Sequence, residues 1–158
     1  MAGQQMRDTG MKNRRIIAIS ALLAAMICSG FTALAHEGAT GIVKDRMDRF
    51  KQSNADIRAV ARLAQSAQFD EIAEISQRMN LWANEMAEYF PLGSDGRPSE
   101  AAAEIWTDPE GFAAAINAYK QATEALMTAA AEENAMDVMR AFQATADSCK
   151  SCHRRYRY

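Results

Sequence analysis

The stretch that decides the fold is residues 149–158, Cys149-Lys150-Ser151-Cys152-His153-Arg154-Arg155-Tyr156-Arg157-Tyr158. Two cysteines separated by two residues, followed at once by a histidine, form the pattern of covalent haem attachment. In this chemistry each thiol adds across one vinyl group of the haem, and the adjacent imidazole becomes an axial ligand of the iron. The pattern therefore predicts one haem c attached through Cys149 and Cys152, with His153 as the axial iron ligand.

Other uses of this motif fit the chain less well. A structural zinc site needs four ligands, and the only other histidine is His36, beside the expected cleavage point. A redox Cys-x-x-Cys pair is expected near a βαβ pattern, and none is visible. The plain structural alternative makes Cys149 and Cys152 small core residues and leaves His153 on the surface. The histidine directly after the second cysteine favours haem.

Working outward from the motif, apolar residues recur at helical spacing in four segments. The stripes span residues 43–64, 72–89, 112–130 and 138–156. Pro91 is expected to end the second helix, and Thr107 or Asp108 can cap the third, with Pro109 at its first position. Cys149 and Cys152 lie on the fourth stripe, so the haem would insert between helices. The sequence predicts an all-α protein, an antiparallel four-helix bundle with haem attached to the C-terminal helix.

The first 35 residues look like a leader rather than part of the bundle. Residues 11–35 combine a basic start, an apolar run over 16–31 and the small-residue motif Ala33-Leu34-Ala35, which is typical of a signal peptide cleaved before His36. The apolar run is shorter than the ~20 residues of a retained membrane anchor. Residues 1–10 are interpreted as an upstream extension or an expression scar. We therefore expect residues 36–158 to form the bundle in the periplasm, without membrane attachment after cleavage.

Charge and composition exclude several functions. From His36 onward the chain has 14 Lys and Arg against 19 Asp and Glu, a net charge of −5, whereas a nucleic-acid partner would favour a basic face. No distal histidine, carboxylate pair or nucleophile with a base stands at recognisable spacing. We expect a protein that is not an enzyme and that binds no nucleic acid.

The sequence resembles the class II c-type cytochromes, and cytochrome c′ in particular. The resemblance extends over the whole expected mature chain and is strongest in residues 43–51, 90–94, 104–112 and 149–157. It implies a four-helix bundle with the haem motif on the last helix, one covalent haem c, and a homodimer formed through the first two helices. It also implies small diatomic gases or a redox partner protein as partners.

The resemblance further assigns residues around the haem. In the family, the residue four after the first-helix arginine faces the distal side of the iron, and counting from Arg46 this residue is Phe50. A phenyl ring cannot ligate iron, so a crowded but open distal site is implied. Arg46 resembles an arginine near a haem propionate, or else is a solvated helix arginine. Arg157 resembles a basic residue on the proximal side, or else is a solvated cation at the helix end.

Met47 keeps a second interpretation open. It lies one turn before Phe50 on the same stripe, and a thioether can be an axial ligand in c-type cytochromes. Methionine in an apolar stripe more often fills gaps in a core. Three hypotheses follow: a five-coordinate haem protein that binds nitric oxide and carbon monoxide, a six-coordinate electron carrier with Met47 as sixth ligand, and a haem-free helical interaction protein of the cell envelope.

Overall fold

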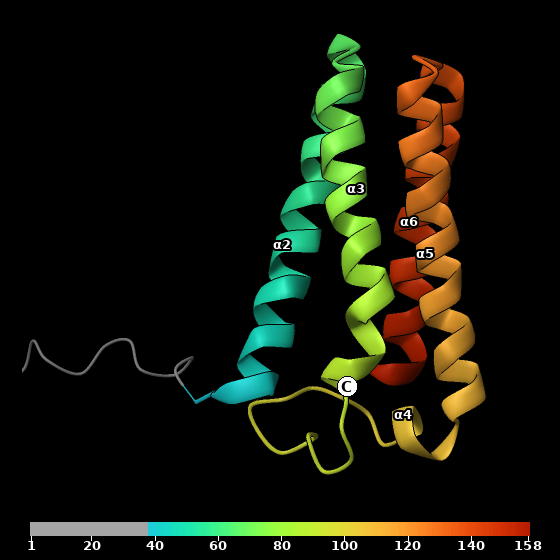
Figure 1. The fold of residues 1–158 in the computed structure, drawn as a ribbon. Helices are drawn as coiled ribbons and strands as arrows, with labels where there is room; N and C mark the ends of the chain where they lie inside the picture. Colours follow the sequence, from blue (N-terminus) through green and yellow to red (C-terminus); the bar gives the residue numbers. More distant parts are fainter. Residues whose placement is uncertain (1–37) are drawn as a thin grey trace, which may run out of the picture. The chain divides into compact units, whose positions relative to one another are not determined.

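A computed structural model describes residues 38–158, in which four long helices run antiparallel to their neighbours in sequence (Figure 1). These are α2 (Gly41–Leu63), α3 (Phe69–Glu85), α5 (Pro109–Ala131) and α6 (Ala135–Tyr156), with a short α4 (Glu104–Thr107) between the two pairs. No strand occurs among the described residues beyond an isolated bridge between Ala101 and Arg157. The predicted all-α four-helix bundle is confirmed. The expected extension at 1–10, the signal peptide at 11–35 and the cleavage point at His36 lie outside the described residues.

The helix ends lie where local sequence signals place them. Asp108 caps α5 by accepting a hydrogen bond from the Gly111 amide at 3.2 Å, and Pro109 follows it at the first helical position. The second helix continues as a 3-10 turn over Met86–Tyr89 and ends before Pro91. Both features follow from proline chemistry, which suits a first turn and disfavours helix in the preceding residue.

One end of the bundle is filled by a compact apolar core. Val60, Ile72, Leu126 and Val138 are all fully buried there, one from each long helix. Alanines 129, 130 and 141 join this cluster and let α5 and α6 approach closely. Burial of each large side chain contributes roughly 1.5–3 kcal/mol, so this end carries much of the stability and leaves the other end free to form a site.

The first predicted stripe divides between two different surfaces. Phe50 and Ile57 line a cavity together with Met47, whose exposed fraction is 40%. Val60, on the same helix, is instead fully buried. The physical reason is that α2 packs on α3 along one side and borders the cavity along another. A single series of apolar residues at helical spacing describes only one such side.

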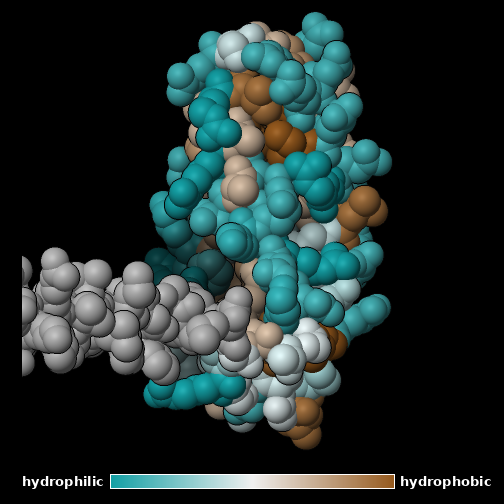
Figure 2. All heavy atoms as spheres, turned by 90° about the vertical axis from the view of Figure 1, so that its left-hand side faces the viewer, coloured by the Kyte–Doolittle hydropathy of each residue, from teal (hydrophilic) through white to brown (hydrophobic). Residues whose placement is uncertain are grey.

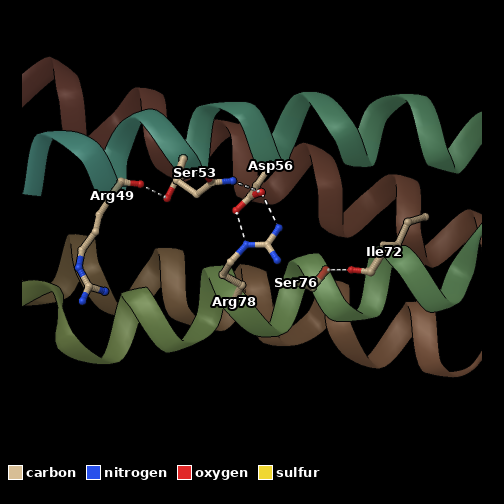
Figure 3. Close-up of polar contacts among 7 residues, drawn as sticks. Arg49, Ser53, Asp56, Ile72, Ser76 and Arg78 are labelled. Carbon is tan, nitrogen blue, oxygen red and sulfur yellow. Dashed lines mark hydrogen bonds and ion pairs between the residues drawn. The ribbon is translucent and has the colours of Figure 1, made fainter. Parts of the chain in front are cut away.

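An ion pair between a buried carboxylate and a half-exposed arginine holds α2 against α3. Figure 3 shows Arg78 of α3 reaching Asp56 of α2, and the Arg78 Nη2 to Asp56 Oδ1 distance is 2.7 Å. Gln52 donates to the same carboxylate at 2.9 Å, and the Asp56 side chain is only 5% exposed. Because a buried carboxylate is costly without partners, this contact fixes how α2 is placed along α3.

The outer face is mainly polar. Figure 2 views the molecule from the side of α2, where hydrophilic side chains cover most of the surface and apolar ones occur in separate groups. Within residues 38–158, no helix is both long enough and apolar enough to cross a membrane.

Candidate haem site

A cavity of about 630 Å³ lies at the end of the bundle where α6 finishes. Its walls come from α2, α5 and α6, closed by Met86, Phe90 and the segment from Pro98 to Ile105. The volume lies within the range of roughly 300–1,000 Å³ that small-molecule and cofactor pockets occupy.

The three motif residues line this cavity together. Cys149 and Cys152 are free thiols, half-buried on α6, and His153 follows at the cavity edge. Burial raises the pKa of the Cys149 thiol, and burial with the neighbouring Cys149 raises the pKa of Cys152 to about 11. Partial burial, helped by the charge of Arg157, lowers the pKa of His153. A neutral imidazole is the form that binds a metal, so the local environment favours ligation.

Phe50 of α2 faces His153 of α6. Their ring centroids are 6.3 Å apart and the rings are inclined at 74°. Phe50 is held by edge contact with Trp82 at 5.4 Å and lies 6.3 Å from Phe90. The structure thus brings together the two residues that the sequence placed on opposite sides of the iron.

Met47 borders the same cavity, one turn of α2 before Phe50, and is not part of the buried core. With 40% exposure it belongs to none of the buried apolar clusters of residues 38–158. The thioether lies in the wall of the cavity. Whether it is the sixth ligand of the iron is a question that the spin state answers.

Arg46 is buried, with 3% exposure, and is not the solvated arginine that was the alternative interpretation. Its guanidinium donates to the Tyr89 carbonyl at 3.0 Å, the Ser94 hydroxyl at 2.7 Å and the Ser99 hydroxyl at 2.5 Å, and also to the Ser94 carbonyl. It lies over the Phe90 ring at 4.6 Å. Burial lowers the pKa of Arg46, and the charge of Asp95 partly offsets this. The residue anchors the loop that closes the cavity.

Arg157 forms an ion pair with Glu100, a residue that the sequence did not single out. The Arg157 Nε donates to Glu100 Oε2 at 2.6 Å, and both side chains line the cavity. The Tyr158 amide also donates to the Glu100 carbonyl at 3.0 Å. The Arg157 side chain is 52% exposed, as expected of a solvated cation at the helix end, but its ion pair ties the end of α6 to the loop.

The cavity has the chemistry that a haem requires. Arg46, Lys51 and Arg157 are basic residues in its wall against one acidic residue, Glu100, which suits a flat apolar group with anionic propionates. Within residues 38–158 no cluster of three or more His, Cys, Asp or Glu could hold a bare metal ion, so the zinc alternative gains no support.

Tyr119 also fits a bound group. The residue is 6% exposed, lines the cavity, and its hydroxyl has no hydrogen-bond partner among the described residues. Burial raises the pKa of Tyr119 strongly, and the nearby Ser53 hydroxyl offsets part of this rise. A buried hydroxyl without a partner costs about 1–3 kcal/mol, which an acceptor in the cavity would recover.

Residues 41–157 match the family model described as cytochrome C′. The chain belongs to the cytochrome c′ family. Members of this family carry one covalently bound haem c, so the prediction of a c-type haem protein is confirmed and the haem-free alternative is wrong. The chain's sequence matches none of the curated proteins with which it was compared.

Solved cytochrome c′ structures share the fold. The protein from Rubrivivax gelatinosus is 23% identical with a TM-score of 0.67, covering 74% of this chain and 94% of that one. A nitric oxide complex of a variant from Alcaligenes xylosoxidans is 22% identical with a TM-score of 0.66, covering 73% and 93%. A cytochrome c′ with ligand-controlled dimer dissociation is 19% identical with a TM-score of 0.69, also covering 73% and 93%.

Proposed function

We propose that this cytochrome c′ holds its haem through Cys149 and Cys152, ligates the iron through His153 and leaves the sixth position open toward Phe50. It binds nitric oxide and carbon monoxide there, with limited electron transfer, and is not an enzyme. The observation that carries the proposal is that Phe50 of α2 and His153 of α6 line one cavity, with their rings edge-on and their centroids 6.3 Å apart.

Phe50 determines which ligands this site favours. The bound haem supplies an iron centre that accepts a small ligand. Phe50 has no lone pair to ligate iron and no proton to donate, so it offers nothing to stabilise a polar bound ligand. Its ring is held between Trp82 and Phe90, which leaves little room for a large ligand. The site therefore favours uncharged diatomic molecules. A variant of the cytochrome c′ from Alcaligenes xylosoxidans, which shares the fold, forms a complex with one of them, nitric oxide.

Basic side chains in the cavity wall would attract the propionates at the anionic edge of the haem. Arg46 has its Nη atoms committed to Tyr89, Ser94 and Ser99, so it supplies positive charge while fixing the loop. Lys51 is an exposed cation of the same wall and is the freer of the two to pair with a propionate.

The six-coordinate electron carrier remains the second candidate. It is favoured by one observation, the presence of the Met47 thioether in the same wall as Phe50. If Met47 is the sixth ligand, Met47→Ala will convert a low-spin protein to high spin. If Phe50 faces an open position, Met47→Ala will leave the spin state unchanged.

Attachment is tested by staining denaturing gels for haem peroxidase activity after expression in a host that attaches haem. The wild-type chain should stain. Cys149→Ala/Cys152→Ala should lose the colour, and Ser148→Ala/Ser151→Ala, which alters neighbouring positions of the same helix, should keep it. Colour retained in the double cysteine variant would contradict the assignment.

We further propose export to the periplasm after cleavage between Ala35 and His36, and a homodimer formed through α2 and α3. Ile42 of α2 and Leu81 of α3 are apolar residues exposed by 37% and 58%, and the cytochrome c′ with ligand-controlled dimer dissociation supports association of this kind. Sedimentation velocity with and without carbon monoxide tests it: a monomer at all concentrations would exclude the dimer.

A further inference from the structure

A second apolar groove lies on the outside of the bundle, beside the haem cavity. It has a volume of about 310 Å³ and is formed by the 3-10 turn Met86–Tyr89 with Phe90, by α4, and by the first turns of α5. Its lining residues are Ala87, Phe90, Ile105, Trp106, Pro109, Phe112, Ala113 and Ile116. The single polar side-chain atom among them, Trp106 Nε1, donates to the Phe90 carbonyl at 3.0 Å. Water therefore finds no free side-chain partner here, and apolar sites of this kind bind small apolar solutes such as xenon.

The groove and the haem cavity are separated by one layer of side chains. Phe90, Ile105, Phe112 and Ile116 line both spaces. Phe90 also lies 6.3 Å from Phe50, the residue placed over the open iron position. The groove thus leads toward the side of the cavity where a gas would bind, because Phe90, one of the four shared residues, also neighbours Phe50.

The members of this layer are not held equally. Phe90 lies under the Arg46 guanidinium and packs edge-on against Phe112 at 5.0 Å, while Phe112 packs against Tyr156 at 5.2 Å. Ile116 is half-buried and packs against two of the buried apolar clusters, so apolar contacts alone hold it. Because side chains packed in a protein interior still change rotamer, Ile116 is the member that can move aside.

We propose that this groove is the site through which uncharged diatomic gases reach the haem cavity, with Ile116 as the movable part of the layer. The proposal rests on the function proposed above. The occupant is an uncharged gas because the groove walls carry no charge, whereas the wall of the main cavity presents Arg46, Lys51, Glu100 and Arg157.

The first test is the rate of carbon monoxide association with the reduced, haem-loaded protein. Ala113 is an exposed residue of the groove wall, and its neighbour Ala114 is equally exposed but lines neither space. Ala113→Trp should slow association at least about fivefold, equivalent to roughly 1 kcal/mol of barrier, and Ala114→Trp should leave it within about twofold of wild type. Ile116→Ala should accelerate association. Equal rates in the two tryptophan variants would overturn the proposal.

The second test does not depend on the iron. Crystals of the haem-loaded protein under xenon should show xenon between Trp106 and Phe112 in the wild type and none in Ala113→Trp. Absence of xenon from the wild-type groove would overturn the proposal. If the reduced protein binds no carbon monoxide at all, the proposed function fails, and the xenon result still decides whether the groove takes up an apolar gas.

Discussion

Replacing Arg46 with methionine keeps an unbranched apolar stem and much of the volume of the side chain but removes a buried cation with four acceptors. The variant leaves the carbonyls of Tyr89 and Ser94 and the hydroxyls of Ser94 and Ser99 without their donor. It also removes the cation that lies over Phe90 at 4.6 Å. The loop that closes the haem cavity is therefore the part of the molecule that the substitution loosens.

The expected loss of stability depends on which of these acceptors can form a hydrogen bond to water once the arginine is gone. Both bonds to Ser94 are buried, whereas those to Tyr89 and Ser99 are partly buried. A hydrogen bond to a charged donor contributes about 1.5–3 kcal/mol, and removal of the buried charge returns part of its desolvation cost. We expect Arg46→Met to lower the free energy of unfolding by about 2–4 kcal/mol, out of a typical total of roughly 5–15 kcal/mol.

The assay is urea unfolding of the haem-loaded protein, followed by far-ultraviolet circular dichroism and by haem absorbance. Ser94→Ala alone should cost about 1 kcal/mol. In a double-mutant cycle the Arg46 and Ser94 substitutions should couple by about 1 kcal/mol, because both remove the same bond. The matched control pairs Arg46→Met with Leu126→Ala in the opposite core, where the costs should add within about 0.5 kcal/mol. A loss below about 1 kcal/mol, or no coupling to Ser94, would refute the role of Arg46 as the loop anchor.

The other predictions concern the iron, acid stability and the core. Phe50→Met should place a thioether opposite His153 and yield a low-spin ferric spectrum, whereas an unchanged high-spin spectrum would show that Phe50 does not face the iron. The hydrogen bond from Tyr156, with the Gly111 amide and the Arg155 charge, lowers the pKa of Asp108 below its ordinary 3.8. The stability from Asp108 is therefore present above that pH and lost as pH falls through the lowered pKa. Asp108→Asn should consequently flatten the acid side of the pH–stability curve, and an unchanged slope would exclude this contribution. Leu126→Ala should cost about 3–4 kcal/mol in urea unfolding, and a cost below ~1 kcal/mol would mean that this core is not closely packed.

Local signals explain why the helices were predictable. Pro91, Asp108 and Pro109 act within one turn of chain, and their effects at the helix ends are as expected. The fourth stripe placed Cys149 and Cys152 on one face of α6 because helical spacing alone decides this. His153 directly follows Cys152 in the sequence, and the structure places all three residues in one wall of the cavity.

Contacts between distant loops were not predictable. The partners of Arg46 and Arg157 lie up to 53 and 57 residues away in sequence, and no periodicity relates them. Ser94 and Glu100 lie in a turn-rich stretch of sequence. A polar residue there predicts a loop but does not indicate which side chain it will contact. The outer groove likewise has no motif, since it arises from the way α4 packs on α5.

The absorption spectrum of the purified ferric protein at neutral pH tests the central claim most directly, because it reports what occupies the position opposite His153. The structure predicts a high-spin, five-coordinate spectrum, since Phe50 offers no ligand to the iron. A low-spin spectrum with a methionine-to-iron charge-transfer band would contradict this account and assign the sixth position to a thioether, with Met47 as its source.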